Sequence, residues 1–259
     1  MSTGARGATL LETRGLRKAF GAFQAVDGVD LVVRGGEMLG LIGSNGAGKT
    51  TLVNVISGLF PVTAGTIVFE GHDVTRQSIN QRIRAGIARS FQLVNLFDQL
   101  TVLDNVALPI FSRRGKARAM LVPAERDRAV LDEAAELLRR FGLADRATQL
   151  AGALAQGERK LLDVAVAYAL RPKLLFLDEP TSGVSTREKA PIMDVISQVV
   201  RAEGITAVVI EHDMDIVYAY SDRIVAMHQG GILAQGTPDE IRADERVLDN
   251  LLGRPVEGA

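Results

Sequence analysis

One stretch decides the fold of this chain: Gly43-Ser44-Asn45-Gly46-Ala47-Gly48-Lys49-Thr50. It fits the pattern G-x-x-x-x-G-K-S/T at every fixed position. The glycines let the backbone turn tightly, so that several N–H groups converge on one point and hold phosphate oxygens. Lys49 adds a full positive charge for the outer phosphates, and Thr50 offers a hydroxyl to Mg²⁺, which prefers oxygen ligands. We therefore predict a phosphate site formed by Gly43, Ser44, Asn45, Gly46, Ala47, Gly48, Lys49, Thr50 and Thr51.

The segments on either side of this loop support a phosphate-binding role. Met38–Ile42 is an apolar run of strand length, and Lys49–Ser57 has the pattern of a helix that stops at Gly58. A helix N-terminus adds the positive end of its dipole to a phosphate site. The order strand, loop and helix distinguishes this loop from a glycine-rich turn with a chance lysine.

A second apolar run, Leu174–Leu177, ends in the two carboxylates Asp178 and Glu179. In a P-loop fold an acid at this strand end holds Mg²⁺, directly or through water, and Asp178 is the candidate. Glu179, one residue further on, would polarise an attacking water as a general base. Together with the phosphate loop upstream, this pair predicts hydrolysis of a nucleoside triphosphate.

The rest of the chain alternates between strand and helix patterns. Val29–Val33, Thr66–Phe69 and Ile205–Ile210 are strand candidates. Continuous apolar runs such as the last of these are typical of a parallel sheet that is buried on both faces. From Phe91 to Arg159 helices are predicted instead. A capping pattern begins there at Thr101, and apolar residues at helical spacing follow: Val130, Ala134, Leu137, Leu138 and Phe141.

Composition is typical of a globular protein and excludes several functions. The chain has 259 residues, of which 47% are apolar and 24% charged, and a net charge of −1 argues against a mainly electrostatic nucleic-acid binder. It has no cysteine, which rules out disulfides and thiolate chemistry, and its three histidines are scattered. Because no apolar stretch reaches 18 residues and no signal peptide is evident, we expect a cytoplasmic location.

Taken in order, these motifs resemble those of an ABC ATPase over most of the chain. Gln92 resembles the family's glutamine at the junction to a helical subdomain, and His212 resembles its switch histidine. Phe20 matches the aromatic residue that stacks on adenine. The family signature, usually L-S-G-G-Q, has its counterpart in Leu154, Ala155, Gln156, Gly157 and Glu158.

The resemblance implies a fold with defined parts. It is an α/β P-loop NTPase (RecA-like) core with a mostly parallel sheet, an N-terminal antiparallel β region and an inserted helical subdomain. We expect a single ABC ATPase domain over residues 1–259. Within it, the expected parts are a nucleotide-binding core at 11–91 and 160–235, a helical subdomain at 92–159 and a short helical tail at 236–259.

The resemblance also implies a mechanism and partners. Members of the family form head-to-tail dimers in which one chain's phosphate loop and the other chain's signature enclose each ATP. Gln92 would sense the γ-phosphate and join Thr50 and Asp178 around Mg²⁺, while His212 would position Glu179 and its water. The implied partners are a second ATPase subunit, two transmembrane permease subunits and, indirectly, a periplasmic or extracellular solute-binding protein. The chain would lie on the inner face of the plasma membrane.

Within the family, several segments resemble the ATPases of branched-chain amino acid importers. These segments are Gly86–Gln92, Leu100–Val106, Glu211–Met214, Gln235–Pro238 and Glu240–Ile241.

Two positions depart from the family pattern. Ala155 replaces the signature serine, which removes a hydrogen bond to ATP that contributes about 1.5–3 kcal/mol. Ser185 stands where the family usually carries an aspartate, in a segment that crosses the dimer interface. We therefore expect an asymmetric pair, in which the second ATPase subunit is a different chain.

Two other functions are alternatives for a chain with these motifs. A non-transport ABC ATPase of translation or DNA repair usually carries two ATPase domains or long coiled-coil inserts, and this chain has neither. Its basic cluster at Arg113, Arg114, Lys116 and Arg118 would suit RNA or lipid headgroups, although a solvated loop is the simpler interpretation. A P-loop kinase or GTPase is disfavoured by the Asp-Glu pair, the signature-like segment and the switch histidine.

Overall fold

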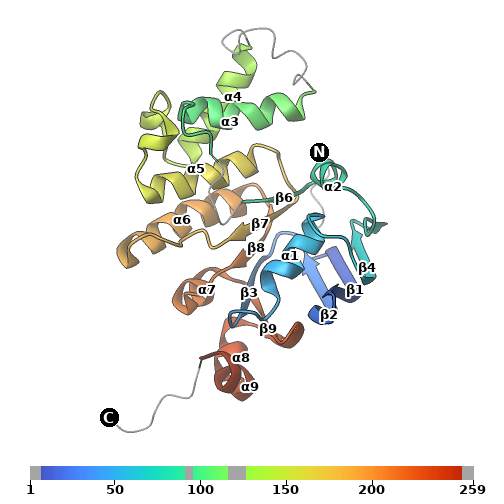
Figure 1. Ribbon diagram of the computed structural model, residues 1–259. Helices are drawn as coiled ribbons and strands as arrows, with labels where there is room; N and C mark the ends of the chain where they lie inside the picture. The colour runs from blue at the N-terminus through green and yellow to red at the C-terminus, as the bar shows by residue number, and fades with distance from the viewer. Residues whose placement is uncertain (1–6, 91–95, 116–126, 253–259) are drawn as a thin grey trace, which may run out of the picture.

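The computed structural model describes residues 7–90, 96–115 and 127–252, and its centre is a six-stranded sheet (Figure 1). The strand order is β10-β9-β3-β8-β7-β6; all neighbours pair in parallel except β10, which is antiparallel to β9. The strands are β3 (Met38–Gly43), β6 (Ile87–Arg89), β7 (Leu174–Asp178), β8 (Thr206–Ile210), β9 (Arg223–His228) and β10 (Gly231–Gly236). The mostly parallel sheet predicted from the apolar runs is confirmed.

The central strands are apolar throughout because both of their faces are covered. Every residue of β7 is buried, and its alternate side chains enter different hydrophobic clusters. Leu175 and Leu177 pack with the helices on one side of the sheet. Leu174 and Phe176 pack on the other side, against α1 (Lys49–Ser57) and a second sheet. The strand that carries Asp178 is therefore held between two cores.

The second sheet is antiparallel and is formed by the N-terminal part of the chain. Its order is β2-β1-β4-β5, and α1 packs beside it in the same hydrophobic cluster (Figure 1). Along β2 every second residue from Val29 to Val33 is buried, as expected for a sheet with one covered face. The strands are β1 (Thr9–Phe20), β2 (Phe23–Arg34), β4 (Ala64–Phe69) and β5 (His72–Asp73).

The helices between β6 and β7 form an arm at one end of the molecule (Figure 1). Thr101 starts α3 as predicted, because its Oγ1 accepts the Asp104 N–H at 3.1 Å. The expected limit of the helical subdomain, between 159 and 160, falls inside α5, whose buried side chains continue into the core cluster. The helices here are α2 (Ile79–Ala85), before β6, and α3 (Val102–Arg113), α4 (Arg128–Arg140) and α5 (Gln156–Tyr168).

The remaining helices follow the core strands and form the tail. In the part that the structure describes, the tail begins with a proline-started helix capped by Thr237 and continues in short helices. Among the described residues, no helix has both the length and the apolar character needed to span a membrane. These last helices are α6 (Thr186–Ala202), α7 (Met214–Tyr220), α8 (Pro238–Ala243), α9 (Glu245–Val247) and a final turn at Leu248–Leu252.

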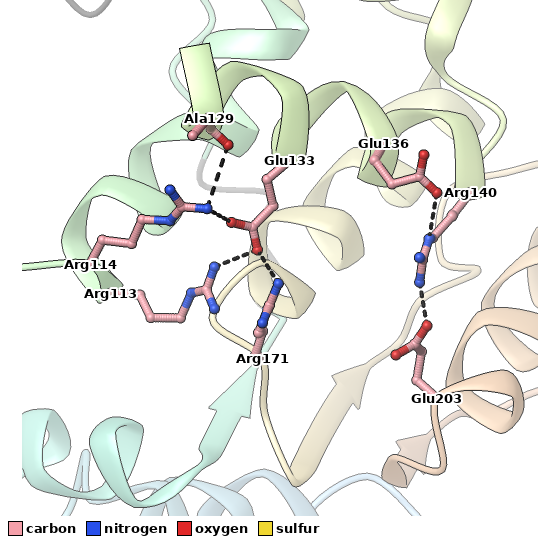
Figure 2. A network of polar contacts seen from close by, with 8 residues as sticks. All are labelled: Arg113, Arg114, Ala129, Glu133, Glu136, Arg140, Arg171 and Glu203. Carbon is pink, nitrogen blue, oxygen red and sulfur yellow. Dashed lines mark hydrogen bonds and ion pairs between the residues drawn. The ribbon is translucent and has the colours of Figure 1, made fainter. Parts of the chain in front are cut away.

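Ion pairs join the helices of the arm to one another and to the segment that follows α5 (Figure 2). Glu133 on α4 accepts hydrogen bonds from Arg113 at 2.5 Å and Arg114 at 2.6 Å, both at the end of α3. Arg171, which follows α5, contacts the same carboxylate at 2.7 Å. Two of the four residues of the predicted basic cluster, Arg113 and Arg114, thus bind Glu133. The other two, Lys116 and Arg118, lie outside the described residues.

The Glu133 cluster should make the stability of the protein depend on pH. Burial alone would raise the pKa of Glu133, but hydrogen bonds from Arg114 and Arg113 outweigh it and leave the pKa below its ordinary value of 4.5. A carboxyl with a lowered pKa in the folded state stabilises the protein above that ordinary value, and the contribution is lost as pH falls through the folded pKa. We expect Glu133→Gln to lower the free energy of unfolding at pH 7 by about 1.5–3 kcal/mol.

Urea unfolding of both proteins at several pH values measures this difference. It should shrink as pH falls below 4.5 and through the lowered pKa of the folded wild-type carboxyl, because that carboxyl then becomes protonated as well. Glu245→Gln, at an exposed carboxylate on α9, is the matched control and should change little. A difference between Glu133→Gln and wild type that stays constant from neutral to acid pH would contradict this assignment.

Candidate functional site

The loop between β3 and α1 has the backbone that its glycines predict. Gly48 has φ +99°, and a Cβ there would lie 2.3 Å from the Ala25 carbonyl oxygen, so only glycine fits. Gly46 also has a positive φ, of +82°. No side chain caps the start of α1, which leaves the first N–H groups of this helix directed towards the loop. The loop can therefore bind an anion through its backbone.

Lys49 is folded back onto its own loop. Its side chain is buried, and its Nζ donates to the carbonyl oxygens of Gly43 at 2.6 Å and Ser44 at 3.1 Å. Burial lowers the pKa of Lys49, while the nearby charges of Glu179 and Asp178 oppose that shift. The lysine is thus a partly desolvated cation facing two carboxylates, and it lies beside the predicted phosphate position.

A cavity of about 290 Å³ opens over the loop. The ends of three neighbouring parallel strands contribute to it, because β3 leads into the loop, β7 into Glu179 and β8 into His212. Its lining consists of Phe23, Ala25, Asn45, Gly46, Ala47, Gly48, Lys49, Thr50, Thr51, Glu179, Ile210 and His212. Residues more than 100 positions apart in the sequence are thus brought to one edge of the sheet.

Glu179 and His212 contact each other at this edge. The His212 Nε2 lies 2.9 Å from the Glu179 Oε1, with 47% of the histidine side chain and 17% of the glutamate side chain exposed. The backbone of Glu179 is left-handed, with φ +48°, a conformation that is strained for a residue with a Cβ. Its N–H donates to the Ile210 carbonyl oxygen at 2.9 Å, which ties the end of β7 to β8.

Asp178 has a partner that the sequence did not point to. It is 2% exposed and forms an ion pair with Arg89, which lies on β6 and also hydrogen-bonds the Asn54 side chain of α1. Arg89 faces Asp178 because β6 pairs in parallel with β7, a register that the sequence does not reveal. A basic residue three positions before Gln92 was the available signal. Gln92 itself lies outside the described residues.

Glu211 is a further residue that sequence reasoning missed. Its buried carboxylate accepts hydrogen bonds from Thr181, at 2.8 Å from the backbone N–H and 2.7 Å from the hydroxyl. These bonds join the segment after Glu179 to the segment that carries His212. The available sequence signal was an acidic residue between an apolar strand run and the histidine.

Two aromatic residues lie near the nucleotide loop. Phe20 packs edge-on against Phe60 with ring centroids 5.4 Å apart, and the Lys18 Nζ lies 4.9 Å above its ring. Phe23, which is 64% exposed, lines the cavity, whereas Phe20 is not among its lining residues. Stacking of adenine on Phe20 stays a prediction, and Phe23 becomes a second candidate.

The signature segment lies apart from the cavity of its own chain. Ala155 precedes α5 without a side-chain cap, and Glu158 accepts the Ala155 N–H at 3.1 Å while pairing with Arg146 at 2.7 Å. None of Leu154, Ala155, Gln156, Gly157 and Glu158 lines the described cavity. The phosphate loop, the two acids and the histidine therefore meet within one chain, and the signature does not join them.

Comparisons with known proteins agree with this constellation. The sequence pattern of the ABC transporter family matches residues 26–182. BraF of Pseudomonas aeruginosa, a high-affinity branched-chain amino acid transport ATP-binding protein, is 35% identical over 249 residues that cover 94% of this chain and 98% of BraF. LivG of Salmonella typhimurium, described in the same words, is 37% identical with the same coverage of both chains.

The solved structures lead to the same family. The ADP conformation of MJ1267, an ATP-binding cassette of an ABC transporter, superposes with a TM-score of 0.84 and 30% identity, covering 95% of this chain and 99% of that one. Both the match of the family pattern and the full-length relatives cover most of this chain. The chain belongs to the ABC transporter family, as an ATP-binding subunit that hydrolyses ATP.

Proposed function

We propose that this chain hydrolyses MgATP to power the import of branched-chain amino acids or similar small solutes. The observation that carries the hydrolytic part is the contact between Glu179 and His212 beside the Lys49 loop, all around one cavity. The cargo is supported by full-length similarity to BraF and LivG, whose names specify branched-chain amino acid transport.

The residues around the cavity suit the chemistry of phosphate hydrolysis. Loop N–H groups and Lys49 would bind the phosphates, with Lys49 exchanging its loop carbonyls for phosphate oxygens. Thr50, Asp178 and Gln92 would hold Mg²⁺. The Thr50 hydroxyl and the buried Asp178 carboxylate are hard oxygen donors, which this ion prefers. Bound Mg²⁺ would neutralise phosphate charge.

Glu179 and His212 would then act on the attacking water. Glu179 would orient the water and accept its proton, and His212 would hold the Glu179 carboxylate and contact the γ-phosphate. Both side chains are partly exposed at the cavity, so a water molecule can reach the carboxylate.

The assembly that we propose is a head-to-tail dimer with a different ATPase subunit. Its support is that none of the signature residues lines the cavity of its own chain, which leaves each site to be completed by a partner. Ala155 lacks the hydroxyl of the usual signature serine, so the site that this chain would complete is the weaker one. Two transmembrane permease subunits would hold the pair at the inner face of the membrane, with a periplasmic or extracellular solute-binding protein on the other side.

The translation or DNA-repair alternative loses its main support. Arg113 and Arg114, which would have contacted RNA, are bound to Glu133. No nucleic-acid partner is proposed.

Purification of the chain with its membrane partners tests the cargo. We expect two permease subunits and a second ATPase subunit to co-purify. The accompanying solute-binding protein should bind leucine, isoleucine or valine in a calorimetric screen against all amino acids and common sugars. A receptor that prefers a sugar or a metal ion would refute the cargo assignment.

Glu179→Gln tests the hydrolytic role in the assembled transporter. General base catalysis contributes about 10²- to 10⁴-fold, so turnover should fall by that order while MgATP still binds. Glu245→Gln, at an exposed carboxylate, should leave turnover unchanged. Full activity of Glu179→Gln would remove Glu179 from the chemistry.

Ala155→Ser tests the asymmetry of the pair. The added hydroxyl should restore a hydrogen bond to a charged group, which contributes about 1.5–3 kcal/mol, or roughly 10- to 150-fold in turnover or ATP affinity. ATPase rates and ATP affinity of the assembled transporter are the measurements. If both stay at the wild-type values, the site is not weakened by Ala155.

A further inference from the structure

We propose that Lys160 is a positioning residue that connects the signature helix to Glu179 of the same chain. The inference rests on the proposed catalytic role of Glu179. Lys160 lies on α5, only two positions after the signature segment, and it is not itself among the residues that line the cavity.

Lys160 is a buried cation held by uncharged acceptors. It is 3% exposed, and its Nζ donates to the Glu179 carbonyl oxygen at 3.1 Å and to the Ser182 Oγ at 2.8 Å. Burying an ammonium group is costly, and a methionine or leucine would fill similar space without that cost. What an apolar side chain cannot do is donate hydrogen bonds to the loop that carries Glu179.

That loop has a backbone that needs support. Glu179 is in the left-handed region, at φ +48°, and such conformations persist only where surrounding contacts hold them. Its N–H is bound to the Ile210 carbonyl oxygen at 2.9 Å, and its own carbonyl oxygen accepts both the Ser182 N–H at 3.0 Å and the Lys160 Nζ. Lys160 thus fixes the carbonyl group of Glu179, and the Ile210 carbonyl oxygen fixes its N–H group.

The position of the Glu179 carboxylate follows from this backbone. If the Glu179 carbonyl loses the Lys160 bond, the peptide can rotate, and the carboxylate then moves relative to His212, which it contacts at 2.9 Å. Displacement by a fraction of an ångström lowers the rate of a reaction that depends on an aligned water. ATP binding, in contrast, uses the phosphate loop and should not change.

The same helix gives Lys160 a link to the other ATP site. Lys160 lies about 6 Å along α5 from Gln156, because a helix rises about 1.5 Å per residue. The start of α5 packs tightly on α6, since a Cβ at Gly157 would lie 3.2 Å from the Ile192 Cδ1. When the signature shifts on the partner's ATP, α5 moves as a rigid unit and carries Lys160, and with it Glu179 and Ser182.

Lys160→Met in the assembled transporter is the central test, because methionine keeps the length and apolar stem of lysine but removes the ammonium. We expect kcat for ATP hydrolysis to fall about 10- to 150-fold, the range for loss of a charged hydrogen bond. KM and the affinity for ATP should change by less than about threefold, because binding in the ground state is untouched. Lys173→Met, at an exposed lysine that pairs with Glu70, is the matched control and should keep kcat.

Two further variants separate positioning from folding. Ser182→Ala removes one of the two acceptors and should lower kcat less than Lys160→Met, and the double variant should be no slower than Lys160→Met alone. Lys160→Gln keeps an amide donor and should be intermediate, and it serves if Lys160→Met does not fold. A loss of kcat that is fully explained by a smaller folded fraction, or an equal loss in ATP affinity, would overturn the positioning role.

The Glu179→Gln experiment keeps the two inferences distinct. If Glu179→Gln abolishes hydrolysis while Lys160→Met and Lys160→Gln keep the wild-type kcat, the inference on Lys160 is wrong and the proposed function stands. If Glu179→Gln remains fully active, the proposed function fails first, and the role of Lys160 fails with it.

Discussion

Parallel pairing of β3, β8 and β7 is the constraint on which the site depends. In parallel strands the carboxyl ends lie at one edge, so the loop after β3, the acids after β7 and the histidine after β8 must meet there. The pairing is strong because both faces of these strands are covered by apolar side chains. The catalytic geometry is therefore a consequence of burial in the sheet, and single contacts such as that between Glu179 and His212 refine it.

The charged side chains at this edge of the sheet are held by polar or charged partners within the protein. Lys49 bonds to loop carbonyls, Arg89 pairs with Asp178, and Glu211 binds Thr181. Buried charges need such partners, because an unpaired charge in a medium of low polarity is unstable. Lys49, Asp178 and Glu211 each thus have a fixed partner within the protein.

The sequence predicted the elements that local chemistry determines. The helix Lys49–Ser57 was predicted with both of its ends, because Gly48 and Gly58 take left-handed conformations at those positions. Asp178 and Glu179 were proposed because they stand together at the end of an apolar strand run, and His212 because it resembles the switch histidine of the family. Arg89, Lys160 and Glu211 were not, since their partners lie 89, 22 and 30 residues away, and only the strand register and the helix packing bring them together. The sequence did not identify Phe23 as a residue that lines the cavity, because an aromatic residue near a turn carries no local sign of it.

The two-sided packing of β7 also bears on how the molecule comes apart. Leu175 and Leu177 belong to the cluster that includes the helical arm, and Leu174 and Phe176 belong to the cluster beneath the antiparallel sheet. Loss of either cluster would uncover one apolar face of the same five-residue strand. We therefore expect arm and core to unfold as one cooperative unit, with the strand that presents Asp178 among the last segments to exchange its amide hydrogens with solvent.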